Sequence, residues 1–340
     1  MKKPKILIPL AVLAIMIAIG LAAMLRKAAP PEPVRLLPGA QAYFYVNLGP
    51  LRRADIKMGS VQLDPDYEHF VKETGFQFER DLDEMATAVH VDEGNGENRF
   101  THIFVGHFDG DKVRRYFNKL SSRVDSYKDV EVFNIPHEDR TVRIAILGPD
   151  MVTVSNVDDP LVIRGVIDRS KKLASPFGGP ALVRHYYRKL PFGTLAWAIA
   201  DIARGSKTNK PFVIPGGFDL FFPPDSVALG SVRYLGSIDF KLEVLTNNEG
   251  DAKRITDQVS AFLALFHSLE SNASGSDPDV KLFFDSLKVE QAGTEAVVSA
   301  ELPKGFLKKI LTEPPPEPQV ATPAPEPAKP PAKPKHKRKR

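Results

Sequence analysis

The sequence contains no cysteine among its 340 residues. This absence excludes disulfide bonds, thiolate metal sites, a thiol nucleophile and a lipid-modified cysteine. The sequence also lacks the short signatures of phosphate, dinucleotide, zinc and serine chemistry, since it has no P-loop, GxGxxG, HExxH, GxSxG or SxxK. No local motif therefore points to an enzyme.

The central part of the chain has no surplus of basic residues. The chain holds 46 basic and 42 acidic residues. Its two ends, residues 1–27 and 313–340, together hold twelve of the basic residues and three of the acidic residues. Residues 28–312 therefore hold 34 basic and 39 acidic residues, a net charge of −5. Because phosphate binding needs a basic face, this balance argues against a nucleic-acid-binding body.

An uncharged apolar run occupies residues 6–25. As a helix it would span roughly 30 Å, the thickness of the hydrocarbon core of a bilayer. The alternative is a cleaved signal peptide, but the small-residue spacings lie inside the run, and Arg26 and Lys27 close it. We expect residues 1–27 to form an uncleaved anchor that inserts in the lipid bilayer through residues 6–25.

The anchor predicts a location for the rest of the chain. Because a short N-terminal tail usually stays in the cytoplasm, we expect a single-pass protein of the cytoplasmic (inner) membrane with its body on the periplasmic side. Residues 28–39, which begin with AAPPEP, are interpreted as a stiff spacer between the bilayer and the body.

The order of periodic segments predicts an α+β fold with an internal repeat. Residues 40–169 and 194–312 are each interpreted as a strand followed by a ββ-α-ββ-α unit with antiparallel hairpins, and residues 170–193 as their connector. Asn95-Gly96 is a strong hairpin signal. The apolar stripe of residues 249–270 is interpreted as packing on its own sheet, because it is short for a coiled coil.

Four groups of polar residues are candidate sites. His102 and His107 are five positions apart on one strand, so they point to opposite faces and cannot chelate together. His90 and Asp92 share a face, but a solvated strand end explains them better than a metal pair does. The segments HEDR (137–140) and DEGNGEN (92–98) are interpreted as hairpin turns rather than as a catalytic pair or a calcium loop.

Aromatic residues supply two more candidates. Trp197 lies in an apolar strand and is interpreted as a core residue rather than a stacking platform. Residues 184–189 interleave bases with aromatics, a composition that can bind sugar, phosphate or a lipid headgroup. An amphipathic linker helix with exposed basic side chains is the favoured interpretation. Asn272-Ala273-Ser274 fits a glycosylation sequon, which we attribute to chance.

Most of residues 35–312 resembles a family of uncharacterised bacterial envelope proteins with a single membrane anchor, of acidobacterial type. The segments that carry the resemblance are TGFQFERDLDEMATAVHV, FTHIFVGHFDGDKVRRYFNKL, TVRIAILGPDMVTVSNVDDPLVIRGVIDR and PFGTLAWAIA. The resemblance implies location and architecture, and it supplies no catalytic or binding residue. The Pro-rich tail is similar to the periplasmic spacer of TonB-type energy transducers, but no domain follows it here.

These observations predict a non-enzymatic, membrane-anchored, extracytoplasmic protein of the cell envelope that acts as a binding or scaffolding module. We expect no catalytic, cofactor-binding or metal site. Two alternatives stay open. One is an extracytoplasmic enzyme, for instance a hydrolase, with a site assembled from residues distant in sequence. The other is a cytoplasmic basic tail that contacts nucleic acid, which the predicted orientation disfavours.

Residues 313–340 are expected to form a disordered tail, because they hold ten prolines and almost no large apolar side chain. The tail ends in five basic residues that could bind an anionic surface, with the bilayer and anionic envelope polymers as candidate partners: Lys335, Lys337, Arg338, Lys339 and Arg340.

Deleting residues 335–340 tests the role of the tail. We expect weaker binding to anionic vesicles or purified wall material at low salt, because each basic residue near such a surface contributes about 1 kcal/mol. The difference between the full chain and the truncated chain should shrink as salt screens these charges. Equal binding of the two chains at low salt would leave the tail without an electrostatic role.

Overall fold

The computed structural model describes part of the chain, namely residues 29–53, 65–91, 98–138, 140–172, 178–202, 212–214, 218–220, 222–234, 237–270, 282 and 285–302. The predicted anchor (6–25), the closing helix expected over 303–311 and the tail (313–340) lie outside these residues. Among the helices that are described, none is both long and apolar enough to span a membrane.

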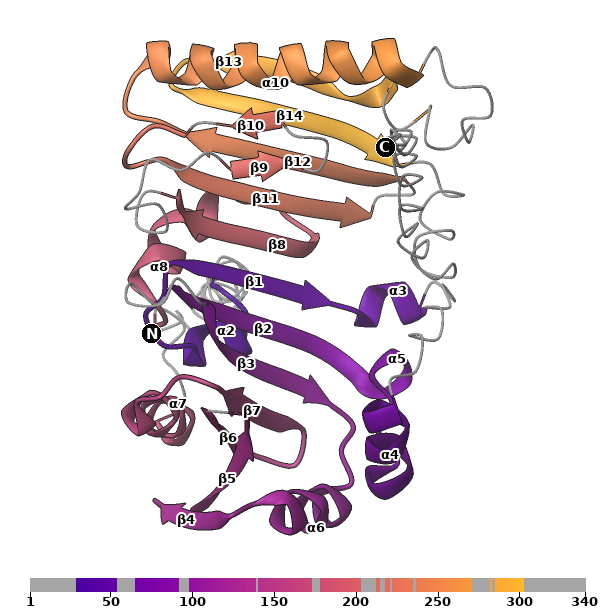
Figure 1. Cartoon of the computed structure of the whole chain (residues 1–340), viewed down its shortest axis with the longest axis vertical. Helices are drawn as coiled ribbons and strands as arrows, with labels where there is room; N and C mark the ends of the chain where they lie inside the picture. Colours follow the sequence, from indigo (N-terminus) through magenta and orange to yellow (C-terminus); the bar gives the residue numbers. More distant parts are fainter. Residues whose placement is uncertain are drawn as a thin grey trace, which may run out of the picture.

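A single antiparallel sheet of twelve strands forms the body, which confirms the α+β class (Figure 1). The first half of the chain supplies β1 (Ala42–Asn47), β2 (Leu82–Val91), β3 (Asn98–Gly106), β4 (Arg123–Tyr127), β5 (Val130–His137), β6 (Arg140–Ile146) and β7 (Met151–Ser155). The second half supplies β8 (Thr194–Asp201), β11 (Val227–Tyr234), β12 (Ile238–Leu245), β13 (Lys288–Ala292) and β14 (Glu295–Leu302). The strand order is β13-β14-β12-β11-β8-β1-β2-β3-β7-β6-β5-β4.

The two halves meet where β1 pairs with β8, from Ala42 opposite Ala200 to Val46 opposite Ala196. We call this pairing the seam. Outward from the seam, the first half has β1, β2 and β3, and the second half has β8, β11 and β12. Between β8 and β11 the chain forms a separate hairpin of β9 (Phe212–Ile214) and β10 (Phe218–Leu220). A helix then leads to the remaining strands. This helix is α6 (Gly110–Leu120) in the first half and α10 (Glu249–Glu270) in the second.

The predicted ββ-α-ββ-α order needs two corrections. Four strands follow α6 instead of two, because β4 pairs with β5 and β5 pairs with β6, so that two more strands extend the sheet. The segments TGFQFER and GGFDLFF, which are similar in sequence, also fold differently. The first contains the short helix α5 (Phe78–Asp81), in which the Asp81 carboxylate accepts a hydrogen bond from the Gln77 N–H at 2.8 Å, and the second contains strand β10.

The ends of three helices follow from their local sequence. Helix α4 (Pro65–Thr74) stops at Gly75, whose φ of 74° only glycine adopts at little cost. Helix α6 begins at Asp109, whose side chain accepts a hydrogen bond from the Lys112 N–H at 3.1 Å. Helix α7 (Pro160–Lys171) begins in the same way at Asp159.

The predicted spacer of residues 28–39 is instead part of the folded body. Helix α2 (Glu32–Leu36) starts after Pro31, and Val34, Leu36 and Leu37 are at most 2% exposed. They join the central core cluster, which lies on β1, β2 and β8. The prolines predicted a stiff linker, but the apolar residues that follow them are buried against the central strands of the sheet.

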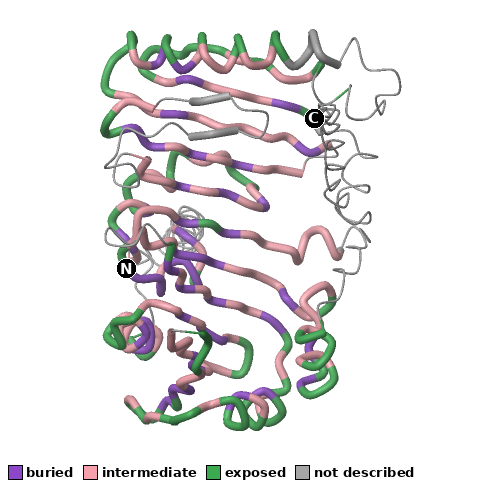
Figure 2. The backbone as a smooth tube through the Cα atoms, in the orientation of Figure 1, coloured by how far each residue is buried: buried purple, intermediate pink, exposed green. Residues whose placement is uncertain are grey.

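Packing of α10 on its own sheet is confirmed. Ala252 and Ile255 are at most 2% exposed, and Ile255 forms a cluster with Val244 of β12 and Ala296 of β14. Figure 2 shows the same division, with buried residues along the strands and exposed residues on the outer sides of α4, α6 and α10.

Replacing Leu36 with alanine tests whether α2 belongs to the core. Leu36 is 1% exposed, so we expect the free energy of unfolding to fall by about 2–5 kcal/mol. Leu161→Ala is the matched control, because Leu161 is 64% exposed and its loss should change stability by no more than about 0.5 kcal/mol. Denaturant unfolding of the full chain in detergent measures both, and equal effects would show that α2 is not a core element.

Candidate functional site

A pocket of about 460 Å³ lies at one end of the seam, and we call it the seam pocket. Its walls come from parts of the chain that are distant in sequence. Strand β1 contributes Tyr45 and Asn47, and β8 contributes Thr194 and Trp197. Residues 187, 188 and 190–193 of the connector form the rim, and Pro31 closes one side. The volume is within the range of small-molecule sites in proteins.

Three aromatic rings build the inner wall of the seam pocket. Tyr45 and Trp197 are direct partners across the seam, with ring centroids 5.6 Å apart. Tyr187 meets Trp197 edge to face at 5.7 Å. Trp197 is 4% exposed, which confirms its interpretation as a core residue. The structure adds that the same ring lines a pocket, which the sequence analysis did not predict.

The connector presents its basic residues outward, as its composition predicted. It consists of α8 (Ala181–Tyr186) followed by a 3-10 turn over Tyr187–Lys189. Val183 is buried, whereas Arg184, His185, Arg188 and Lys189 are exposed. Lys189 pairs with Glu295 of β14 at 2.9 Å. Unlike the other basic residues of the connector, Arg188 lines the seam pocket, and it is the one charged residue among the described residues that line it.

A partly buried acid lies directly behind the pocket wall. The Tyr45 hydroxyl donates a hydrogen bond to Oε2 of Glu84 on β2 at 2.9 Å. Burial raises the pKa of Glu84, and the nearby charges of Asp83 and Glu32 raise it further, although the bond from Tyr45 acts in the opposite direction. Burial, followed by the proximity of Glu84, also raises the pKa of Tyr45. At neutral pH the tyrosine is therefore a hydrogen-bond donor and not an anion.

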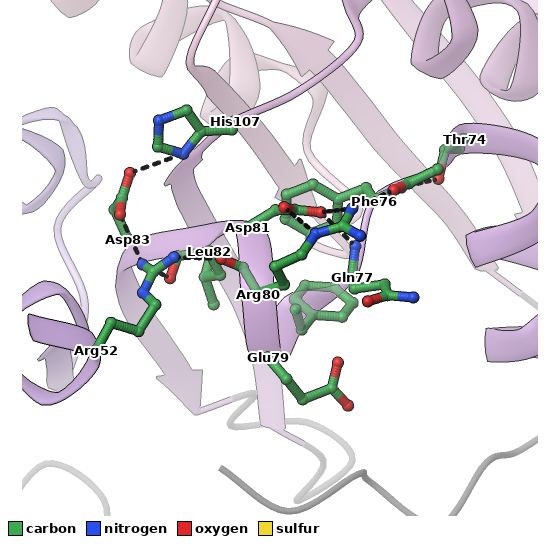
Figure 3. A network of polar contacts seen from close by, with 12 residues as sticks. Arg52, Thr74, Phe76, Gln77, Glu79, Arg80, Asp81, Leu82, Asp83 and His107 are labelled. Carbon is green, nitrogen blue, oxygen red and sulfur yellow. Dashed lines mark hydrogen bonds and ion pairs between the residues drawn. The ribbon is translucent and has the colours of Figure 1, made fainter. Parts of the chain in front are cut away.

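The residue before Glu84 belongs to a surface network that fixes the start of β2 (Figure 3). Asp83 accepts a hydrogen bond from Arg52 of α3 (Gly49–Arg53) at 2.6 Å, and Arg52 also donates to the carbonyl oxygens of Arg80 and Leu82. His107 lies 3.4 Å from the other Asp83 oxygen, and its side chain is 79% exposed. This acid and histidine therefore meet on the open surface and line neither described pocket.

The other candidate residues have structural roles in the described part of the chain. His102 lies 3.0 Å from the Thr87 hydroxyl and His90 lies 3.2 Å from that of Thr101, and burial lowers the pKa of both histidines. His102 and His107 do not meet, as predicted. In the segment 137–140, His137 ends β5 and pairs with Arg140, which begins β6, while Asp139 lies outside the described residues.

Several candidates lie outside the described residues: Asp92, the hairpin tip that follows it, Asn272, and the five basic residues of the tail. Among the residues that are described, no group of three or more histidine or acidic side chains could hold a metal ion.

Comparison with known proteins adds no assignment. No protein-family model matches the chain, and no curated protein matches it significantly. Among solved structures, crystal forms IV and III of TP0453 align with TM-scores of 0.45 and sequence identities of 10% and 11%. Each alignment covers 83% of this chain, and 97% and 98% of the respective TP0453 chains. A similarity at this level supports no conclusion about function.

The raised pKa of Glu84 predicts a pH dependence of stability. The folded chain binds this proton more tightly than the unfolded chain does, so the free energy of unfolding falls as pH rises above the ordinary glutamate value of 4.5. Glu84→Gln cannot ionise and can still accept the bond from Tyr45. We therefore expect Glu84→Gln to be more stable than the natural chain at pH 7, and this advantage to disappear near pH 4.

Urea unfolding in detergent at both pH values measures this difference. Glu290→Gln on β13 is the matched control, because Glu290 is exposed. If the stability of Glu84→Gln changes with pH in parallel with that of the natural chain, folding does not raise the pKa of Glu84.

Proposed function

We propose that this chain is a non-enzymatic binding protein of the cell envelope, anchored in the cytoplasmic membrane by residues 6–25, which holds a small ligand in the seam pocket on the extracytoplasmic side. The observation that carries the proposal is the construction of the pocket. Tyr45, Trp197 and Tyr187 supply an aromatic wall, and Asn47, Thr194 and Arg188 supply polar groups. Aromatic walls with a few converging polar groups are typical of ligand sites.

The position of the pocket supports a binding role within a duplicated body. From the seam outward the two halves share the order of three strands, a helix and further strands. We infer from this order that residues 40–169 and 194–312 are two copies of one unit, with β4 and β5 added to the first copy. The seam pocket would then lie where the two copies join, which is a common position for ligand sites.

The hydrolase alternative needs two acids, or a histidine and an acid, that converge on one cavity. Glu84 lies behind Tyr45 and does not line the seam pocket, and the pair of His107 and Asp83 lies on the open surface. The described geometry therefore favours binding over hydrolysis.

Trp197 provides a direct test because it is the single tryptophan of the chain and lines the pocket. Its emission should change in a saturable manner with one of three soluble probes: glycerol 3-phosphate, N-acetylglucosamine or a short peptide. Thr194→Tyr should abolish the response by filling the pocket. Thr246→Tyr is the matched control, because Thr246 is also half-buried and its hydroxyl also donates to a backbone carbonyl.

The same proposal has a second requirement, the location of the body. Alkaline phosphatase fused after residue 312 should be active, because this enzyme folds only outside the cytoplasm. An inactive fusion, or a Trp197 emission that none of the probes changes, would refute the proposal.

A further inference from the structure

We infer that the seam pocket takes the phosphate-bearing headgroup of an anionic glycerophospholipid from the membrane in which the chain is anchored. This inference rests on the proposed function, and it names the ligand class of the same site. Three features support it: the position of Pro31, the charge of Arg188 and the exposure of Phe192.

The first feature is the short distance between the predicted anchor and the pocket. The predicted anchor ends at Leu25, and Pro31 lines the pocket. Six residues of extended chain span at most about 20 Å. Because α2 folds into the body and provides no spacer, the pocket is held close to the bilayer surface. Its nearest abundant small groups are therefore lipid headgroups.

The second feature is the sign of the charge in the pocket. Arg188 is its one charged lining residue, and this side chain makes no hydrogen bond or ion pair with another residue in the described ranges. Lys189, the next residue, is already paired with Glu295. A guanidinium group can bind two phosphate oxygens at once, so Arg188 is suited to recognise a phosphate ester.

The third feature is an apolar side chain at the rim. Phe192 also lines the pocket and is 78% exposed, the most exposed large hydrophobic residue in the described part of the chain. It lies between Pro191 and Gly193, whose φ of 77° favours glycine. One exposed ring is ordinary on a protein surface. Beside Arg188, however, it offers an apolar surface next to a cation, as an amphiphilic ligand requires.

The polar groups inside the pocket suit the remainder of such a headgroup. Asn47 and Thr194 provide an amide and a hydroxyl, and the Tyr45 hydroxyl is held in place by Glu84. A glycerol phosphate group carries hydroxyls that can bond to these side chains. Free glycerol phosphate offers the same chemistry as the lipid, so the test must separate the two sources.

The test uses the full chain reconstituted in phosphatidylcholine vesicles, with Trp197 emission as the readout. One arm adds increasing fractions of phosphatidylglycerol to the vesicles, and the other adds soluble glycerol 3-phosphate. We expect a saturable response in both arms. Arg188→Ala should weaken both by about tenfold, the weight of one charge-assisted contact. Arg184→Ala should change neither, because Arg184 is an exposed arginine of the same connector outside the pocket.

Phe192 separates the lipid from the free phosphate. Phe192→Ala should weaken the response to phosphatidylglycerol more than the response to glycerol 3-phosphate. Phe44→Ala is the matched control, since Phe44 is 45% exposed and does not line the pocket. The basic tail is present in every variant, so its own attraction to the vesicles is the same throughout. Arg188→Lys keeps the charge and should lose less than Arg188→Ala.

Three results would overturn the inference. Equal responses of Arg188→Ala and Arg184→Ala would remove phosphate recognition. A response to glycerol 3-phosphate alone would assign the pocket to a soluble phosphate. Saturable binding of N-acetylglucosamine or peptide without a response to phosphate would refute this ligand class and leave the proposed binding function intact. Failure of every probe would refute both.

Discussion

The antiparallel pairing of β1 with β8 is the constraint on which the rest of the structure depends. It joins the first strand of each half, so that two groups of strands become one sheet. Across this seam Tyr45 packs on Trp197 at 5.6 Å, and aromatic cross-strand pairs of this kind are among the more stabilising contacts in sheets. Without the pairing, both β1 and β8 would be exposed sheet edges.

The segment before β1 packs on the central strands of the sheet. Val34, Leu36 and Leu37 cover the central strands, and Val183 of the connector belongs to the same cluster. Two parts of the chain that flank the first half thus meet on one face of the sheet. Because they meet there, the loop from Tyr187 to Gly193 is held over the ends of β1 and β8, and the seam pocket forms beneath it.

The pocket combines features that local packing alone does not require. Burial of Trp197 and Tyr45 contributes to the core, but the exposed Phe192 and the unpaired Arg188 bury little surface. Glu84 lies behind the pocket wall, where burial disfavours its ionised form, and it holds the Tyr45 hydroxyl through a hydrogen bond. Side chains that cost stability, or contribute little to it, are the ones most readily explained by binding.

Much of the fold was predictable from short-range patterns. The order of periodic segments predicted the α+β class, and the apolar spacing in residues 249–270 predicted a helix that packs on its own sheet. These features depend on contacts between residues that are close in sequence, so the pattern in one segment is sufficient to determine them.

By itself, the sequence determined the absence of cysteine chemistry, the acidic central region between two basic ends, and most of the strands and helices. The tertiary structure alone decided that α2 is core and not spacer, that β1 pairs with β8, and that Trp197 lines a pocket as well as the core. Tyr45 and Trp197 are 152 positions apart in the sequence, and no local period predicts their contact. The contact forms because β1 pairs with β8 at the seam, and the packing of the whole chain determines that pairing.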